Sequence, residues 1–502
     1  MLRYTGHPIV DVGAATIAAF AGKSNVASVT EEDLDQFAAY MEQNYVVNPL
    51  KSFLTVAFPN SGFTNPAFEK NPGRRLDYAR MVGRAFRADV PGSGEKCVFF
   101  GEPALGIPLT ESEGAGRAFR QHIPLVTGEG VINFHPGGDA GLPVSGLALL
   151  CIQAFPLGCA KCGGRLLAVH ADNEEITFEF ARAFLEENMK AVQLARQSGS
   201  TKLSEAKRLP KTLLVETLLA IEERRRDALR EDEPASVTAY HLSNSGQSNP
   251  LDVNNPPLTI YHLPLEMTGF LRRAMAADYR GAWQALVQRA WQLNPHPEKK
   301  GRRKATAATR ETEAEQAFEP RRNFLFEDWF GLPENAPDFV RRYFLRIPRR
   351  FAGEDDPRRY YSLKNEADLV SWRLTELFLE RVMNVDKRRI QEIRALGDRL
   401  ADYVDTQNDR RFFLNFFREQ NYGNFRAVLL KANLAHVKRG NPPLITLDPY
   451  LEVFEDGVNV AGSDWRLARD LVLIRLIETL YERGWLGRNQ DVIPEIPAEE
   501  GD

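Results

Sequence analysis

The chain has 502 residues, of which 43% are hydrophobic and 26% are charged, and its net charge at pH 7 is −4. This composition is typical of a globular protein with two or three domains, and it excludes a polycation or a low-complexity chain. The longest apolar run, from Val144 to Gly158, is shorter than a bilayer span, and four cysteines without a secretory leader do not indicate disulfides. We therefore expect a cytoplasmic protein with no membrane partner.

The first segments of the chain mix helical and extended patterns. Thr30 precedes three acidic residues and the run LDQFAAYMEQNY, which predicts a capped helix. Residues 52–57 predict a strand that leads into the polar loop FPNSGFTNP. Further along, helices are expected at about 174–197 and 209–231, and the similar segments SVTAYHL and LTIYHLP are expected to be strands on either side of a second polar loop.

Residues 95–172 are rich in glycine and contain all four cysteines. Cys159 and Cys162 form a Cys-x-x-Cys turn, whereas Cys97 begins a similar turn in which Phe100 stands where the second sulfur would be. A tetrahedral zinc site held by these three sulfurs would need a fourth ligand, and the candidates are His122, His135, His170 and Cys151. The alternative is a degenerate zinc ribbon without metal. In either case the segment is structural and the protein requires no cofactor, while Cys151, inside LALLCIQAF, is expected to be buried.

The two polar loops share the pattern N-S-G-x-[ST]-N-P. These residue types are the ones that turns prefer. They also carry uncharged amide and hydroxyl groups that can pair with the edges of bases. We therefore predict that the loops read a few bases, and the residues expected to form or support this surface are Asn60, Ser61, Thr64, Asn65, Asn244, Ser245, Gln247 and Asn249. Lys70, Arg74 and Arg75 are candidates for holding phosphates nearby.

Basic residues are concentrated in two later segments. A run in the region 295–322 predicts a basic loop, with Lys299, Lys300, Arg302, Arg303 and Lys304. Residues 381–440 have 13 Lys and Arg against 7 Asp and Glu, a net charge of +6, and residues 441–502 have 5 against 13, a net charge of −8. The spacing after residue 366 is helical. The candidate backbone-binding residues there are Lys387, Arg388, Arg394, Arg410, Arg411, Arg418, Lys431, Lys438 and Arg439.

Four phenylalanines of this region are spaced as a helix core rather than as a stacking surface: Phe412, Phe413, Phe416 and Phe417. The chain contains no G-x-S-x-G elbow, no Walker phosphate loop and no H-E-x-x-H motif. We therefore expect a protein that is not an enzyme. The alternatives are an enzyme, such as a nuclease or hydrolase, with an unrecognised site, and a zinc-ribbon protein that binds structured RNA in translation or RNA processing.

An ordered set of segments carries a family resemblance. The opening YTGHPIVDVGAATIAAFAGK, the loop FPNSGFTNP, the pair CVFFG and GCAKCGG, and YHLSNSGQ together resemble the CxxC–CxxC branch of the large subunit of type I CRISPR Cascade complexes, and are most similar to subtype I-B. The motifs span about residues 1–270, and the remainder agrees only in its helical, basic character. Phe100 departs from the family pattern and puts metal binding in doubt.

The resemblance implies a non-catalytic subunit of a cytoplasmic ribonucleoprotein that serves antiviral defence. Such a subunit recognises the short PAM in duplex DNA, helps to open the duplex into an R-loop and holds the displaced strand. Its partners are the crRNA, the target DNA, the Cascade backbone and crRNA-end subunits, and a helicase-nuclease or transposition effector. A small subunit belongs to the same assembly, and translation from Met383 would produce one of 120 residues (502 − 383 + 1).

Together these observations predict an α+β protein. A mixed N-terminal domain would carry a degenerate zinc-ribbon-like insertion, and a C-terminal α-helical bundle that resembles a small subunit would follow it. The expected boundaries are 1–94 with 173–365 for the mixed domain, 95–172 for the insertion, 366–490 for the bundle, and 491–502 for an acidic tail.

Overall fold

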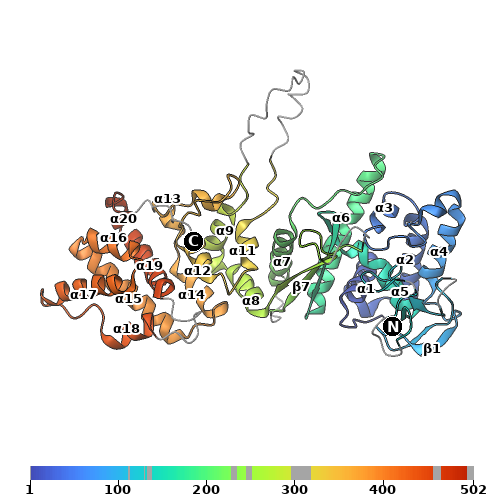
Figure 1. Cartoon of the computed structure of the whole chain (residues 1–502), viewed down its shortest axis with the longest axis horizontal. Coiled ribbons are helices and arrows are strands. Elements are labelled where there is room, and N and C mark those ends of the chain that lie inside the picture. Colours follow the sequence, from blue (N-terminus) through green and yellow to red (C-terminus); the bar gives the residue numbers. More distant parts are fainter. Residues whose placement is uncertain are drawn as a thin grey trace, which may run out of the picture. The chain divides into compact units, whose positions relative to one another are not determined.

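The chain is mixed in secondary structure, with 55% helix and 9% strand, and the C-terminal region is helical. The computed structural model divides into two compact units, an N-terminal unit, Met1–Leu265, and a C-terminal unit, Glu266–Asp502. Figure 1 shows the elements of each. The residues that the structure describes are 2–110, 114–128, 130–132, 138–227, 234–244, 251–294, 318–455 and 465–493. The predicted α+β class is therefore confirmed in its coarse form.

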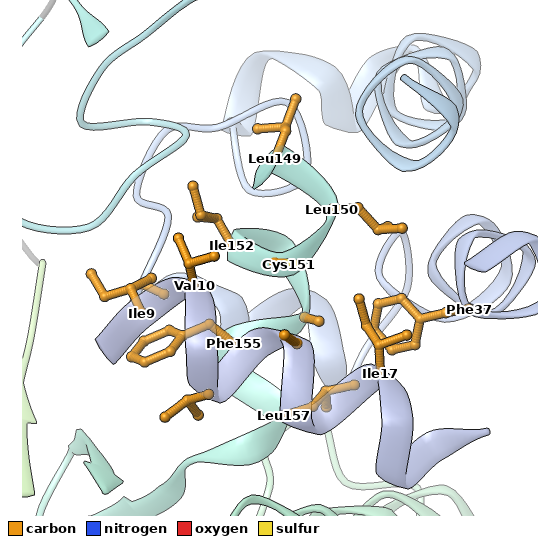
Figure 2. Packing of buried hydrophobic residues seen from close by; sticks show 14 of the residues in the cluster. Ile9, Val10, Ile17, Phe37, Leu149, Leu150, Cys151, Ile152, Phe155 and Leu157 are labelled. Atoms are coloured by element: carbon orange, nitrogen blue, oxygen red, sulfur yellow. The ribbon is translucent and has the colours of Figure 1, made fainter. Parts of the chain in front are cut away.

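The core of the N-terminal unit is organised around helix α1 (Pro8–Phe20), which is buried along most of its length. It packs against α5 (Gly146–Ala154) and α6 (Glu174–Gln197). Figure 2 shows the aliphatic side chains of α1 and α5 interdigitating. The crossing is close because Gly13 has no side chain, and a Cβ there would lie 1.8 Å from the carbonyl oxygen of Cys151. An all-round apolar helix at the centre explains the hydrophobic opening of the sequence.

Three further helices lie near the start of the unit: α2 (Glu31–Asn44), α3 (Leu50–Leu54) and α4 (Pro72–Arg84). The predicted cap of α2 is confirmed, because Thr30 and Asp33 form a reciprocal capping box. The strand predicted for residues 52–57 is wrong, since that segment belongs to α3 and the turn after it. The buried residues follow a helical spacing rather than an alternating one: Leu50, Phe53, Leu54, Ala57 and Phe58.

A four-stranded antiparallel sheet forms the second layer of the N-terminal unit. Its strands lie in the order β5 (Ala160–Cys162), β6 (Arg165–Ala171), β7 (Val237–Leu242) and β8 (Leu258–Leu263). The last two are the predicted pair of similar strands. Helices α6 and α7 (Pro210–Asp227) connect β6 to β7, close to the predicted helical ranges.

The glycine-rich region contributes several small elements to the N-terminal unit. Strands β1 (Gly92–Lys96) and β2 (Pro103–Leu105) form one short hairpin, and β3 (Arg117–Ala118) pairs with β4 (Leu142–Pro143). The short helix η3 (Phe155–Gly158) follows α5.

The glycine- and cysteine-rich segment 95–172 was expected to form a separate insertion. Instead, it supplies two central parts of the N-terminal unit, because α5 packs on α1 and β6 lies inside the sheet. Its Cys-x-x-Cys turn is the β5–β6 hairpin, where Gly163 and Gly164 take the positive φ values of 59° and 75°. Those glycines serve the tight hairpin itself. A separate zinc-ribbon-like insertion is not shown by this arrangement.

The C-terminal unit begins well before residue 366, where the bundle was expected to start. Helices α8 (Leu265–Ala274), α9 (Ala277–Arg289), α11 (Phe324–Trp329), α12 (Ala336–Phe339) and α14 (Trp372–Arg381) enclose an aromatic core. Shorter helical segments connect them, and these are η4 (Val340–Phe344), η5 (Pro357–Tyr360), α13 (Leu363–Glu366) and η6 (Ala367–Leu369). The central rings of the core are Phe270, Trp283, Trp329, Phe339 and Phe378.

The remaining helices of the C-terminal unit pack around α19 (Trp465–Glu482), whose residues are mostly buried. Helix α15 (Lys387–Gln407) lies along α19, and Gly397 faces Arg475 at their crossing. This unit also contains α16 (Arg410–Arg418), α17 (Tyr422–Val437), α18 (Leu447–Phe454) and α20 (Trp485–Arg488). The N-terminal unit also contains the short helices η1 (Val26–Ser28) and η2 (Pro66–Lys70). In the described part of the chain, no helix is both long enough and apolar enough to cross a membrane.

Candidate nucleic-acid interface

The first polar loop uses most of its polar side chains to hold its own shape. The hydroxyl of Thr64 donates to the carbonyl oxygen of Phe58 at 2.6 Å, and the hydroxyl of Ser61 lies 3.3 Å from that of Thr64. Asn65 accepts a hydrogen bond from the backbone at the start of η2 and caps it. Ser61 is fully buried. Ser61, Thr64 and Asn65 therefore act in the turn and can only support a base-reading surface, and that role stays a prediction.

Asn60 differs from its neighbours in this loop. Its side chain is exposed, and its backbone has the left-handed φ of 60° that asparagine tolerates better than most residues. Gly62 follows in a crowded position, since a Cβ there would lie 2.1 Å from the ring of Tyr78. The buried glycine thus fixes a turn that holds the amide of Asn60 in solvent. Of the four candidates in this loop, Asn60 is the one free to meet a ligand.

Asn244 is a buried clamp rather than a reader of bases. Its side-chain nitrogen donates to the carbonyl oxygens of Ala57 and Arg120, and its side-chain oxygen accepts from the Arg120 guanidinium and the Leu125 backbone. The backbone N–H of Asn244 donates to the carbonyl oxygen of Val56. Only 1% of the residue is exposed. Of the two roles predicted for Asn244, forming or supporting the base-reading surface, the supporting one fits this arrangement, because all of its amide groups already have partners.

The same clamp brings the starts of the two matching loops together. Val56 and Ala57 stand just before the first loop, and Asn244 is the first residue of the second, so the hydrogen bonds of Asn244 join the two loop starts. Ser245, Gln247 and Asn249 lie outside the described residues, and their base-reading role stays a prediction.

The basic residues beside the first loop divide into a buried and an exposed group. Arg75 is buried, and its guanidinium lies 3.4 Å from the carboxylate of Glu69, which also pairs with Lys51 at 2.7 Å. Lys70 and Arg74 are exposed. Arg75 is therefore committed to the fold, whereas the other two can meet a phosphate.

The predicted basic residues of the C-terminal unit are mostly on the surface. Three of them already have a described partner, since Arg388 pairs with Glu452 at 3.1 Å, Arg410 pairs with Asp491, and Arg439 donates to Gln407. The other six are exposed and form no ion pair with any carboxylate that the structure describes: Lys387, Arg394, Arg411, Arg418, Lys431 and Lys438. The run of Lys299, Lys300, Arg302, Arg303 and Lys304 lies outside the described residues.

Helix α16 shows how the sequence separates core from surface. The four phenylalanines of its inner face are buried, as predicted: Phe412, Phe413, Phe416 and Phe417. The residues at positions i, i+4 and i+7 on the outer face are Arg411, Asn415 and Arg418, and all three are exposed. Because the inner face is anchored by aromatic rings, the outer face is held as a fixed polar stripe.

The cysteines do not converge on a metal centre among the described residues. The thiol of Cys159 donates to the carbonyl oxygen of Phe155, and that of Cys162 donates to the carbonyl oxygen of Arg208. Burial raises the pKa of the Cys159 thiol, so it remains protonated. No group of three or more Cys, His, Asp or Glu side chains within the described ranges is placed to hold a metal ion. Zinc binding through Cys97, Cys159 and Cys162 stays an untested prediction.

The proposed fourth ligands also have other surroundings. Cys151 is fully buried in the core, as predicted. The ring of His122 lies between Phe119, at a centroid distance of 4.8 Å, and Tyr78, at 6.3 Å. Burial lowers the pKa of His122 to about 4, so the neutral imidazole is the stable form. His135 lies outside the described residues.

A buried aspartate near the N-terminus lies next to a histidine, as in a catalytic pair, but its carboxylate binds backbone N–H groups. One oxygen of Asp11 lies 3.1 Å from Nε2 of His170, and the carboxylate also accepts from the backbone of Thr5 and Gly6 and from the hydroxyl of Thr5. The Thr5 hydroxyl therefore points to the aspartate and is not activated by a histidine. The arrangement fixes the turn before α1, and it supplies no nucleophile–base pair.

One exposed basic and aromatic segment was missed by the sequence reasoning. Residues 349–360 read RRFAGEDDPRRY, and most of them lie on the surface of the C-terminal unit, with Phe351 81% exposed and Tyr360 51% exposed. The signal that could have identified them is an aromatic residue beside each of two arginine pairs. No protein-family model matches the chain, and a search of curated proteins finds no relative.

Proposed function

We propose that this chain is the non-catalytic large subunit of a crRNA-guided type I CRISPR Cascade complex, most similar to subtype I-B. In this role it recognises the PAM in duplex DNA, aids duplex opening, holds the displaced strand and recruits the effector. The observation that carries the proposal is the set of exposed Lys and Arg side chains on α15 and α16 and on or directly after α17 that form no ion pair within the described part of the chain. The sequence resemblance supplies the assembly to which this cationic surface would belong.

The spacing of these cations supports a role in holding a nucleic-acid backbone. Lys387 and Arg394 are seven residues apart on α15, as are Arg411 and Arg418 on α16. Seven residues are about two helical turns, so the members of each pair lie on the same side of their helix. Cations without neighbouring carboxylates attract phosphates strongly and independently of base sequence. In a guide-directed complex, base pairing with the crRNA supplies the specificity that such contacts lack.

The surface proposed for reading the PAM is smaller than the sequence pattern indicated. Among the described residues, Asn60 supplies the exposed amide of this surface, and Lys70 and Arg74 supply its phosphate contacts. Ser245, Gln247 and Asn249 are assigned to the surface from the sequence pattern alone. Asn244 supports the site by joining the starts of both loops. The proposed partners are the crRNA, the target duplex, the displaced strand, the backbone and crRNA-end subunits, a small subunit, and the effector, and the proposed location is the cytoplasm.

Co-purification tests the assembly directly. The tagged full-length chain would be expressed together with the proteins encoded beside its gene and a matching guide array. We expect a complex that contains the guide RNA and that binds duplex DNA with the PAM more tightly than duplex without it. A chain that is recovered without RNA, or a complex that ignores target DNA, would contradict the proposal. Cleavage of DNA or RNA by the isolated chain would contradict its non-catalytic part.

The cationic helices are tested by removing one pair of charges. We expect the Arg411→Gln/Arg418→Gln variant to bind target DNA about tenfold more weakly and to lower the slope of log affinity against log salt by about 2, because two phosphate contacts are lost. Arg483→Gln is the matched control, since Arg483 already pairs with Asp402 at 2.6 Å. Equal binding by the double variant and the control would remove the helices from the interface.

A further inference from the structure

The loop of residues 349–360 in the C-terminal unit, named here the 349–360 loop, combines features that the preceding sites do not. Phe351 is 81% exposed, which is unusual for a phenyl ring, and Tyr360 is 51% exposed. Arg349, Arg350 and Arg359 are exposed and form no ion pair with a carboxylate that the structure describes. The loop therefore presents two water-exposed rings and three exposed guanidinium groups, of which that of Arg359 donates to the carbonyl oxygen of Ala352.

The loop is held in place by its own backbone. The N–H of Arg349 donates to the carbonyl oxygen of Arg358 at 2.9 Å, which closes the base of the loop. Within it, the N–H of Ala352 donates back to Arg349, and the hydroxyl of Tyr360 donates to the carbonyl oxygen of Glu354. The two rings are thus presented by a closed loop whose ends are tied together.

A buried ion-pair network anchors the loop to the core. Arg358 is 5% exposed and contacts both carboxylate oxygens of Asp356, at 2.7 Å for the shortest contact. It also pairs with Asp328, which accepts a hydrogen bond from Tyr343. The guanidinium carbon of Arg358 lies 4.7 Å from the centre of the Phe324 ring. Because Arg358 has these partners, it belongs to the scaffold, and the exposed arginines beside it are left for a ligand.

Residues outside the loop contact Asp355 and place a further arginine nearby. The N–H of Leu293 donates to the carbonyl oxygen of Asp355 at 2.9 Å, and the side chain of Gln292 donates to the Asp355 carboxylate at 3.0 Å. Gln292 in turn accepts a hydrogen bond from the backbone of Arg321, which is exposed. A fourth arginine is thereby placed next to the loop.

We propose that the 349–360 loop binds single-stranded nucleic acid, with a base stacked on Phe351 or Tyr360 and the flanking phosphates held by Arg349, Arg350 and Arg359. This inference rests on the proposed nucleic-acid function and names a contact within it. Bases of a single strand expose their faces to aromatic side chains, whereas those of a duplex are stacked on each other. Glu354 and Asp355 belong to the same loop, but neither forms an ion pair with Arg349, Arg350 or Arg359 among the described residues, so these three guanidinium groups can meet a polyanion. A duplex could meet the arginines but not the rings.

Substitutions at Phe351 test the stacking contact. Binding of a short fluorescein-labelled oligothymidylate to the full-length protein would be measured by anisotropy. Phe351→Ala is expected to weaken this binding about tenfold while changing duplex binding much less. Phe351→Leu should also weaken it, whereas Phe351→Trp should retain it and add a tryptophan emission that the oligonucleotide quenches. Tyr481→Ala is the matched control, because Tyr481 is an exposed ring, 48% accessible, on α19.

The outcomes separate this inference from the proposed function. If oligothymidylate binding depends on Arg411 and Arg418 but Phe351→Ala behaves like Tyr481→Ala, the stacking site is wrong and the nucleic-acid function stands. If Phe351→Ala weakens oligothymidylate binding but no guide-containing complex is recovered, the loop contact stands and the Cascade assignment fails. Displacement by polyglutamate as efficiently as by unlabelled oligothymidylate of equal charge would mark an acidic-peptide site and overturn the inference.

Discussion

An asparagine side chain can serve either a turn or a ligand, and the difference depends on whether its amide already has partners. In the sequence Asn60 and Asn244 occupy the same position of a repeated pattern. In the structure, the first is exposed, and the second is buried with hydrogen bonds to both amide groups. At the scale of single residues, therefore, the sequence pattern identifies the polar loops, and burial decides which members can bind.

Asn244→Ala should destabilise the protein rather than selectively weaken DNA binding. The substitution removes the four hydrogen bonds that the Asn244 amide makes with Ala57, Arg120 and Leu125, which is expected to cost about 2–4 kcal/mol in the free energy of unfolding. Urea denaturation followed by circular dichroism measures this cost. Asn71→Ala, at an exposed asparagine in the same unit, should change stability by less than about 0.5 kcal/mol. Equal midpoints for the two variants would show that the clamp contributes nothing.

His122 should make the N-terminal unit sensitive to acid. The pKa of its buried imidazole is lowered to about 4, below the value of about 6.5 in an unfolded chain, so the unfolded state binds the proton more readily. The resulting stability is fully present above pH 6.5 and is lost as the pH falls toward 4, by about 3 kcal/mol in total. Unfolding free energies measured across this range for His122→Gln should lose that part of the slope. His262→Gln, at an exposed histidine, should keep it.

At the scale of elements, helices with clear caps or long periodic runs were predictable, and short ones were not. Thr30 and Asp33 mark the start of α2 in the sequence because the capping box needs only local contacts. The segment around Phe53 contains strand-forming residues, yet tertiary packing selects the short helix α3. Similarly, Cys159 and Cys162 indicate a knuckle, but local spacing cannot show that their hairpin continues into a central sheet. The exposure of Phe351 could not be predicted from the sequence either, since apolar residues are usually assigned to the core.

The crossing of α1 and α5 should be intolerant of any added side chain. Gly13→Ala would place a methyl group 1.8 Å from a backbone oxygen of α5, so one helix must move. We expect a loss of more than about 2 kcal/mol in the free energy of unfolding. Gly281→Ala is the matched helical control, because nothing lies within 4 Å of a Cβ in α9 at that position. It should raise stability by up to about 1 kcal/mol, and a comparable loss in both variants would refute the packing explanation.

At the scale of the whole molecule, the two compact units each have a core of their own. The large aliphatic core around α1 is built from residues between Leu2 and Leu242, and the aromatic core around Trp329 belongs to the C-terminal unit. We expect two unfolding transitions in calorimetry. Gly13→Ala should lower the midpoint of one, and Phe413→Ala, which removes a fully buried ring, should lower the other. A single transition that both variants shift equally would mean that the units unfold as one.

Translation from Met383 is a further expectation for the whole gene. A product beginning there would lack α14 but keep α15 and α19. Their seam is internal to the fragment and includes the contact of Arg475 with Asp398 at 2.7 Å. Met383 itself is nearly buried, and its N–H donates to the carbonyl oxygen of Phe378 in α14, so the start of the fragment would lose contacts that the full chain makes. We infer that such a product would depend on partner subunits to cover the face that α14 leaves.

Expression of the native gene with a C-terminal tag tests this expectation. The tag should detect the full-length chain and a second product of 120 residues (502 − 383 + 1). Changing the codon to give Met383→Leu should abolish the short product and leave the full-length chain folded, because leucine and methionine are similar in volume. Because the short product lacks the contacts with α14, we expect it to be recovered mainly together with the proposed complex, and this co-purification is a second measurement. A short product that survives Met383→Leu would indicate proteolysis near this helix end, and a tagged full-length chain alone would end the internal-start hypothesis.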